Sequence, residues 1–294
     1  GKVTVTDKST VKVYYVKDES AKHSISAQVD YYFGDTLEAA KAKTQADATD
    51  EAVSKTEWIG QATTVTVEPN ITDKFTGYAY NSIVGELSYT VDAGEQNDTE
   101  THVVKVYYVK DNGQTKALAY TVQYYLDGQP ASNAETYTED IWVNSDQTSL
   151  AVQAGSVNTT DKFEGYTFDY SNPTTIPGTV ADGTVIRVYY ARDVIGTDPE
   201  NPNTPDGIPD KYQATVTFNV VNGTWTGGET SQSAVVTLMK DGVPAAAVDG
   251  GVYQITDGDV PNGTPNAGYL NTGAWRDGRN PANAIINGDT TFTF

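Results

Sequence analysis

The chain has no cysteine, one methionine and two histidines among its 294 residues. Without cysteine it can form no disulfide framework, no thiol nucleophile and no cysteine metal site. That absence leaves the compartment open, because exported proteins can also lack cysteine. No apolar run in the sequence is long enough to span a bilayer, so we expect no membrane insertion of this chain.

Recognisable catalytic patterns are also missing. The sequence contains no G-x-S-x-G, no P-loop and no H-E-x-x-H pattern. Its two histidines, His23 and His102, are expected to be solvated surface side chains, and no pair of carboxylates stands out for glycoside chemistry. We therefore expect no enzyme activity.

Positive charge is scarce. The chain carries 39 acidic and 19 basic side chains, a net charge of −20. This balance argues against nucleic acid or an anionic membrane surface as a partner. We interpret it as a solubility feature of an expected monomer.

Tyrosine, by contrast, is abundant at 20 residues, and it accompanies many valines and threonines. Aromatic and β-branched side chains suit a pleated, half-buried surface, so this composition predicts a chain rich in strands. With 38% hydrophobic residues, each folded unit can bury only a modest core.

Three phrases recur in the same order along the chain. They are Val-Lys-Val-Tyr-Tyr-Val-Lys-Asp at 11–18 and 104–111, with Ile-Arg-Val-Tyr-Tyr-Ala-Arg-Asp at 186–193; Thr-Asp-Lys-Phe-x-Gly-Tyr at 72–78 and 160–166; and Val-x-Tyr-Tyr at 29–32 and 122–125. The internal period of about 80–95 residues is too long for a solenoid and predicts a tandem array of small domains. Such arrays usually extend, space or bind.

The repeats divide the chain into five parts. These are a terminal hairpin of a truncated preceding repeat at 1–18, a first repeat at 19–111, a second repeat at 112–193, an acidic proline-rich linker at 194–211 and a different module at 212–294. The chain starts without methionine and inside a repeat, so we expect a fragment. A lone hairpin is marginally stable, so we expect it to pack on the first repeat or to pair with another chain.

Within the first repeat we expect strands at 24–33, 63–68 and 86–91 and a final strand at the Tyr-Tyr tail. A helix capped by Asp35 should run from Leu37 toward Val53. The second repeat should open with a strand at 119–126 and an Asp-Gly turn. The distance between corresponding phrases of the two repeats falls from 93 residues at the opening strand (29 to 122) to 82 residues at the tail (106 to 188). The second repeat has therefore lost residues, from the expected helix and the final loop.

The linker holds four prolines, at 199, 202, 205 and 209, and these should stiffen it toward polyproline II. Its oxygen-bearing side chains are the candidate ligands for calcium, with Gly207 permitting a sharp turn. The candidate ligands are Asp198, Glu200, Asn201, Asn203, Asp206 and Asp210. The alternative is a solvated acidic linker without metal.

The aromatic residues also allow two interpretations. Neighbouring side chains of a strand face opposite sides, so one tyrosine of each pair should face the core. The other should make cross-strand contacts or, alternatively, offer a ring on which a sugar could stack. Trp225 and Trp275 are expected in the core of the last module, with a surface patch as the alternative.

The recurring Tyr-Tyr tails and Asp-Lys-Phe-x-Gly-Tyr phrases resemble mucin-binding-protein-type (MucBP) repeats of Gram-positive surface proteins. Residues 212–294 resemble the Listeria–Bacteroides-type repeat of internalin-like surface proteins. That second resemblance is carried by Val216-Thr-Phe, Pro265-Asn-Ala-Gly-Tyr269, Trp275, Gly288-Asp-Thr-Thr-Phe and the join Asp206-Gly-Ile-Pro-Asp210.

The resemblance implies an α+β, β-rich fold: tandem small β-grasp-like (ubiquitin-like) domains in an elongated array, each a mixed sheet over one helix. Immunoglobulin-like β-sandwiches are the alternative. It also implies an extracellular, cell-wall-anchored protein of a Gram-positive bacterium. A Lys–Asn isopeptide crosslink would suit such a chain, but the sequence does not place one.

The expected function is that of a non-enzymatic stalk or adhesin region that spaces or presents a binding module. One alternative is direct binding of host mucin, a host glycan or an extracellular protein by the repeats. Another is an accessory region of a secreted enzyme.

Overall fold

The computed structural model describes residues 2, 4, 7, 8, 10–72, 74–131, 133–160 and 162–294, with residue 277 described by its backbone alone. By their contacts these residues form two compact units. The first holds residues 1–116 and 140–146, and the second holds 117–139 and 147–294. Each unit is β-rich, and α1 (Leu37–Lys41) is the one α-helix of the described residues.

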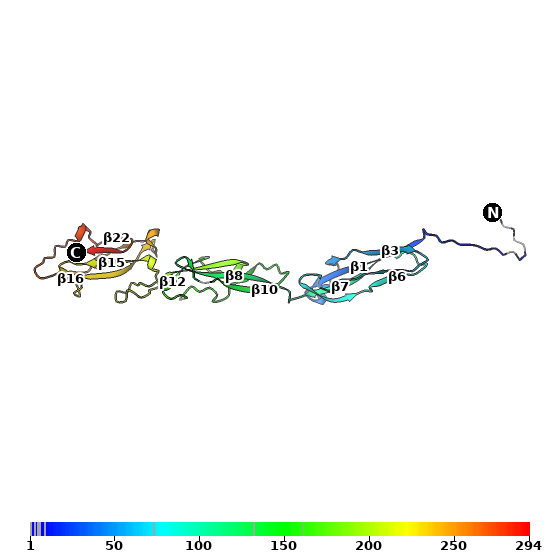
Figure 1. Ribbon diagram of the computed structural model, residues 1–294, viewed down its shortest axis with the longest axis horizontal. Coiled ribbons are helices and arrows are strands. Elements are labelled where there is room, and N and C mark those ends of the chain that lie inside the picture. The colour runs from blue at the N-terminus through cyan, green and yellow to red at the C-terminus, as the bar shows by residue number, and fades with distance from the viewer. Residues whose placement is uncertain are drawn as a thin grey trace. The chain divides into compact units, whose positions relative to one another are not determined.

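The first repeat is built on a mixed sheet of five strands, which lie side by side in Figure 1. These strands are β1 (Lys22–Gly34), β2 (Ala48–Thr49), β3 (Val53–Trp58), β5 (Tyr78–Val84) and β7 (Thr101–Lys110), and a separate pair is formed by β4 (Thr63–Thr66) and β6 (Ser88–Val91). The sheet order is β2-β1-β7-β5, with β3 also paired to β1. The first and last strands, β1 and β7, are parallel neighbours.

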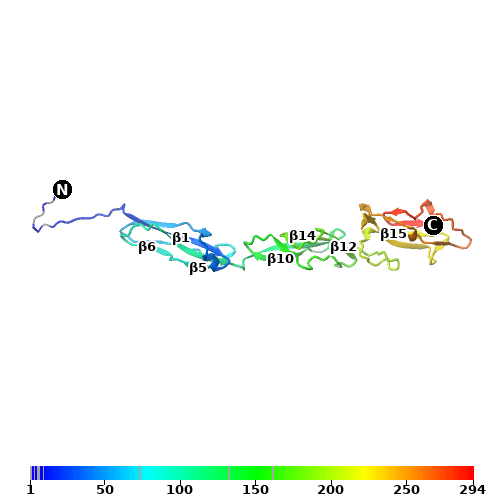
Figure 2. The same ribbon diagram turned by 180° about the vertical axis from the view of Figure 1, so that it is seen from behind.

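The second repeat has the same central arrangement, seen from behind in Figure 2. Its strands are β8 (Thr115–Leu126), β9 (Gln129–Pro130), β10 (Glu135–Trp142), β12 (Tyr166–Asn172) and β14 (Thr184–Arg192), with a separate pair of β11 (Ser149–Ala151) and β13 (Thr179–Ala181). The order is β10-β8-β14-β12, and β8 and β14 are parallel. No helix occurs among its described residues.

The C-terminal module begins at the 3₁₀ turn η1 (Asp210–Tyr212) and contains a three-stranded sheet in the order β17-β15-β23. Its strands are β15 (Gln213–Asn219), β16 (Gly223–Trp225), β17 (Ser231–Thr237), β18 (Met239–Lys240), β19 (Val243–Pro244), β20 (Tyr253–Gln254), β21 (Gly263–Pro265), β22 (Ile285–Ile286) and β23 (Thr290–Thr293); its further 3₁₀ turns are η2 (Ala247–Asp249), η3 (Asp257–Asp259) and η4 (Arg276–Gly278). Trp225 is buried and donates from Nε1 to the carbonyl of Phe218 at 2.9 Å. Trp275 packs in the same cluster, so both tryptophans belong to the core as expected.

The recurring phrases of the sequence build the same core contact in the first repeat and again in the second. In the first repeat the hydroxyl of Tyr108 donates to the carbonyl of Asn70 at 2.7 Å, and the ring of Phe75 packs edge-on against Tyr108 at 5.1 Å. Nζ of Lys74 lies 4.0 Å from the ring centroid of Tyr31. We call this arrangement the tyrosine lock.

The second repeat reproduces the tyrosine lock with its own copies of these residues. Tyr190 donates to the carbonyl of Asn158 at 2.9 Å, Phe163 packs edge-on against Tyr190 at 5.2 Å, and Nζ of Lys162 lies 4.3 Å from the ring of Tyr124. Because each buried hydroxyl has a partner, the burial of these tyrosines carries no unpaired polar group. The recurring phrases are therefore core-forming elements.

In the four tyrosine pairs of β1, β7, β8 and β14, one tyrosine faces the core, as predicted, whereas Tyr14 and Tyr15 are both exposed. Tyr31, Tyr108, Tyr124 and Tyr190 are almost completely buried. Their sequence neighbours lie on the other face of the sheet, where they pair across strands.

The predicted helix is correct in place and wrong in extent. Thr36, not Asp35, is its N-cap and accepts from the amide of Ala39 at 3.2 Å. The helix ends at Lys41 because the chain then returns to the sheet, where β2 pairs with Tyr31 and Val53 starts β3. Strand pairing thus overrides the helix propensity of the sequence beyond Lys41.

The predicted hairpin at 1–18 depends partly on residues 1, 3, 5, 6 and 9, which lie outside the described residues. Residues 10–18 form no strand, and their apolar side chains are exposed. Contrary to the expectation of packing, these apolar side chains do not bury against the first repeat, although Nζ of Lys17 lies 4.7 Å from the ring centroid of Trp58.

His23 corrects the expectation of a solvated side chain. It is completely buried, with Nδ1 3.1 Å from the carbonyl oxygen of Glu95 and Nε2 2.9 Å from that of Gln61. His102 is half-buried, stacked on Tyr89 at 4.1 Å and bonded to Asp98 at 2.7 Å. Sequence reasoning missed both because no local pattern marks a histidine that bridges distant loops.

Candidate functional site

The outer face of each repeat sheet carries a row of side chains across its three strands. In the first repeat the row is Tyr32, Tyr107 and Ser82, and in the second it is Tyr125, Tyr189 and Tyr170. The two rows occupy equivalent register positions. They differ in what covers them and in the third residue.

The first row lies beneath the helix. Tyr32 and Tyr107 are 5% and 7% exposed, and they cluster with the fully buried Ala40 of α1. Ser82, the third member, has a buried Oγ without a hydrogen-bond partner among the described residues. A larger side chain at this position would therefore meet an already packed region.

The second row is partly exposed: Tyr125 and Tyr189 are half-buried, and no helix of the described residues covers them. The rings of Tyr125 and Tyr189 stack at 4.8 Å, and those of Tyr189 and Tyr170 stack at 4.3 Å with an interplanar angle of 11°. Tyr170 is 49% exposed. We call these three residues the tyrosine ladder.

The geometry of the tyrosine ladder limits what it can bind. Rings that stack on one another cover each other's faces, so the ladder presents mainly ring edges along its length. Tyr170 lies on β12, the last strand in the sheet order, and its outward face is the face without a ladder neighbour. A planar apolar ligand surface could stack there at one ring.

A polar row adjoins the tyrosine ladder two residues along each strand. Gln123 is paired with Arg187 across the parallel strands, and Arg187 is paired with Asn172 across the antiparallel ones. Their equivalents in the first repeat are Asp30, Lys105 and Val84. Amide and guanidinium groups beside an aromatic ring supply the hydrogen-bond donors that orient a hydroxyl-rich ligand.

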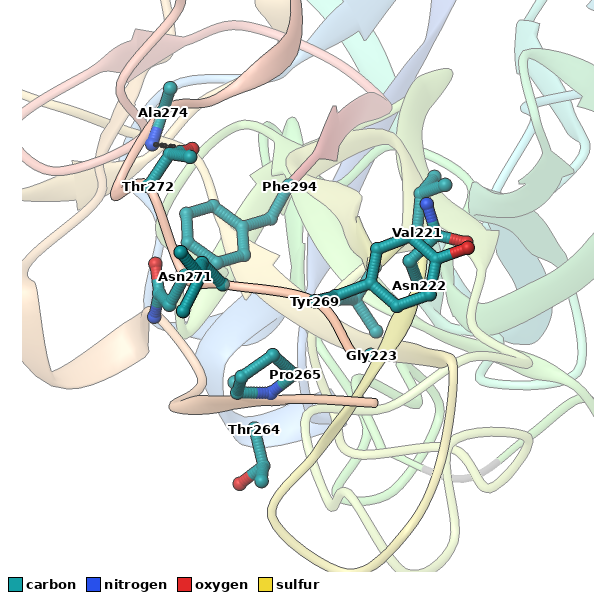
Figure 3. A pocket seen from close by; sticks show the side chains of 13 residues that line it. Val221, Asn222, Gly223, Thr264, Pro265, Tyr269, Asn271, Thr272, Ala274 and Phe294 are labelled. Carbon is teal, nitrogen blue, oxygen red and sulfur yellow. Dashed lines mark hydrogen bonds between the residues drawn. The ribbon is translucent and has the colours of Figure 1, made fainter. Parts of the chain in front are cut away.

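A second concave feature lies in the C-terminal module. A shallow pocket of about 150 Å³ is lined by β16, β21, the 269–274 loop and Phe294. Figure 3 shows the Tyr269 side chain beside Asn222, with the Phe294 ring at the inner wall. No aspartate, glutamate, lysine, arginine or histidine of the described chain lines it, and its titratable side chain is the phenol of Tyr269.

The linker does not adopt the extended form predicted from its prolines. Asp193 is buried and accepts from the amides of Asp206 at 3.1 Å and Gly207 at 2.9 Å, so the chain doubles back on itself. Asp210 accepts from the amides of Val194 and Ile195. Carboxylates that accept backbone hydrogen bonds at both ends of the segment outweigh the stiffness of the prolines.

The candidate calcium ligands are distributed along this folded loop. Asp198 accepts from the amide of Glu200 at 2.9 Å and from the side-chain amide of Asn201 at 3.2 Å, and it lines a small hollow against β17 together with Asn203. Asp206 accepts from the amide of Thr197 at 3.0 Å. Among the residues that the structure describes, no group of three or more acidic, histidine or cysteine side chains is arranged to hold a metal ion. Calcium binding stays a prediction.

The carboxyl of Asp193 was not among the candidates, although it organises the loop. Burial, together with the nearby charges of Asp206 and Asp210, raises its pKa above the ordinary value despite the two amides that it accepts from. Its position at the end of the Tyr-Tyr tail, where the first repeat has Asp111, is the signal that could have identified it.

No helix in the described parts of the chain combines the length and the apolar character needed to cross a membrane. Also among these residues, no nucleophile, base and acid converge in either concave feature.

Comparisons with known proteins gave matches at the level of structure. No family model and no curated protein sequence matches the chain. A type 2 repeat of the mucus binding protein MUB from Lactobacillus reuteri matches with 18% identity over 57% of this chain and all of that one, with a TM-score of 0.22. Domains 3-4 of the Streptococcal High Identity Repeats in Tandem (SHIRT) of a cell surface protein match with 10% identity over 56% of this chain and 96% of that one, with a TM-score of 0.25. Both matches are repeats, one from a mucus binding protein and one from a cell surface protein.

Proposed function

We propose that this chain is a non-enzymatic repeat region of a cell-wall-anchored surface protein of a Gram-positive bacterium. In this role its β-grasp-like repeats space or present a binding module outside the cell. The observation that carries the proposal is the parallel pairing of the first and last strand of each repeat, β1 with β7 and β8 with β14.

This pairing suits a domain that transmits tension. When a repeat is pulled from its two ends, neighbouring parallel strands are loaded along their length in opposite directions. All their interstrand hydrogen bonds then bear the force together, whereas a terminal antiparallel hairpin would open one bond at a time. The packing of α1 on the mixed sheet favours the β-grasp-like form over the immunoglobulin-like alternative for the first repeat.

The test is to stretch the whole chain between two handles and record each unfolding event. We expect two events of similar force from the repeats, each releasing roughly 30 nm of chain. Val188→Ala, at a buried position of β14, should lower the force of one event, whereas Val185→Ala, at an exposed position of the same strand, should not. Repeats that extend at forces too low to resolve would contradict the proposed role.

Direct binding of a host glycan by the second repeat is a second candidate function, favoured by the open face of Tyr170. The test measures binding of the chain to immobilised mucin and to a glycan array. Tyr170→Ala should weaken binding at least about tenfold, because a stacked sugar loses its platform. Val243→Ala removes an exposed apolar side chain of another module, away from both the tyrosine ladder and the pocket at Tyr269, and serves as the control. Equal binding by both variants would remove the tyrosine ladder as the contact.

A further inference from the structure

The same eight residues occur in this chain in two different environments. Val11–Asp18 and Val104–Asp111 have identical sequences. In β7, Val104, Val106 and Tyr108 are completely buried. Their counterparts Val11, Val13 and Tyr15 are 63%, 68% and 93% exposed, and none of them belongs to a strand.

The turn that follows the octapeptide is also the same in both places. The amide of Ser20 donates to Oδ1 of Asp18 at 3.0 Å, as the amide of Gly113 donates to Oδ1 of Asp111 at 2.8 Å. Both turns lead directly into the first strand of a repeat, β1 in one case and β8 in the other. Val11–Asp18 therefore has the same position in the sequence relative to the first repeat as Val104–Asp111, at the end of β7, has relative to the second repeat.

The segment cannot take up this arrangement with the repeat that follows it. A strand of the β7 kind lies parallel to a strand of the β1 kind, and parallel neighbours need a connection of about a dozen residues. Between Asp18 and β1 lie the three residues Glu19, Ser20 and Ala21. Both sides of β1 are moreover occupied, by β7 on one and by β2 and β3 on the other.

We propose that Val11–Asp18 is a docking strand for an open sheet of this same repeat kind, on another segment of polypeptide that lacks a last strand of its own. In the partner, the docking strand lies between two strands, as β7 does here. It pairs in parallel with the strand equivalent to β1 and antiparallel with the strand equivalent to β5. The partner holds apolar sites for Val11, Val13 and Tyr15. It also holds a backbone carbonyl for the hydroxyl of Tyr15, as Asn70 provides for Tyr108.

A second copy of this chain is a poorer partner, because the corresponding places in its repeats are filled by its own β7 and β14. Those strands are held covalently beside their neighbours, at an effective concentration that a segment from another chain cannot match. The chemistry of the docking strand thus points to an incomplete repeat.

The test mixes the full chain with a separate polypeptide of residues 19–100, which is a repeat body without β7. The two are diluted together from urea, and amide hydrogen exchange is followed at residues 11–17. We expect a one-to-one complex in which these amides become protected. A second polypeptide of residues 112–183, which lacks β14, is run in parallel so that poor solubility of one body does not decide the result.

Two variants of the full chain complete the design. Val13→Lys places an ammonium group in an apolar site and should weaken the complex about 100-fold or more. Lys12→Gln changes a position whose counterpart, Lys105, is exposed in β7, and should bind as the unmodified chain does. Because both side chains are exposed in the chain itself, neither change should alter its melting.

Three results would overturn the proposal. The first is a lack of protection at residues 11–17 with both polypeptides. The second is equal binding by the Val13→Lys and Lys12→Gln chains. The third is self-association of the full chain through residues 11–18 at the same concentrations, which would make a second copy the partner instead.

Discussion

The two repeats share a core and differ on the opposite face of the sheet. In both, a buried tyrosine of the last strand donates to an asparagine carbonyl, and a lysine lies over the buried tyrosine of the first strand. On the outer face, the first repeat covers its tyrosine pair with α1, whereas the second leaves the pair bare and adds Tyr170. The core thus tolerates little change, and the outer face is where one repeat can acquire a property that the other lacks.

The largest expected effect tests whether the cores are equivalent. Tyr108→Ala and Tyr190→Ala each remove a buried ring and its hydrogen bond, so each should lower the free energy of unfolding of its repeat by about 3–5 kcal/mol. Chemical denaturation of the full chain, followed by hydrogen exchange in each repeat, measures the two losses separately. Losses that differ by more than about 2 kcal/mol would show that the tyrosine lock is not energetically the same in both repeats.

The next effect tests the difference between the outer faces. Tyr107→Ala opens a cavity beneath α1 and should cost about 3 kcal/mol, whereas Tyr189→Ala, at a half-buried position that no described helix covers, should cost about 1 kcal/mol. The same denaturation measurement reports both. If the two variants lose equal stability, the helix contributes no additional burial to the first row.

A third substitution converts one row into the other. Ser82→Tyr places the residue of the second repeat beside Tyr107, at a position whose Oγ is buried, and should cost about 2 kcal/mol. Ser82→Ala is the control and should be neutral or slightly stabilising, because it removes a buried hydroxyl without a partner among the described residues. Stabilisation by tyrosine would mean that this position accommodates a ring easily.

The smallest effect concerns pH. A hydrogen bond from Lys162 holds the pKa of Glu135 below its ordinary value, against the opposing effect of partial burial. A carboxyl with a lowered folded-state pKa contributes stability above about pH 4.5, and that stability is lost as the pH falls through the folded-state pKa. Because the pair is partly exposed, the loss should be below about 1 kcal/mol.

Glu135→Gln should therefore flatten the acid side of the stability profile of the second repeat while leaving the first unchanged. Urea unfolding between pH 6 and pH 3 measures the effect, with the exposed Glu164→Gln as control. An identical pH profile for Glu135→Gln and the unmodified chain would place the acid sensitivity elsewhere. The buried Asp193 acts in the opposite sense: its raised pKa makes the linker loop more stable as the pH falls toward the ordinary carboxyl value.

Much of the core-facing side of each repeat sheet could be predicted from the sequence. Alternation assigned one tyrosine of each pair to the core, and the recurring phrases marked equivalent units. Both predictions depend on local periodicity, which a single sequence carries.

The rest depends on contacts between distant residues. The helix ends early because β2 must pair with Tyr31, and the linker folds because Asp193 captures the amides of Asp206 and Gly207. The tyrosine ladder could not be predicted from composition either. It requires that Tyr170 and Tyr189 be paired in register and that the helix over the pair be missing, and neither fact is local.

The turn at Asp111 carries a consequence for how such a chain can change in evolution. The Asp111 carboxylate accepts from the Gly113 amide in this turn, and Gln114 donates to both the carboxylate and the carbonyl of Asp111. Duplication or deletion of a whole repeat at this boundary would leave the turn chemically unchanged, as its second occurrence at Asp18 and Ser20 illustrates. A gene that encodes such a turn can therefore vary in length by complete folding units while each unit keeps its own core.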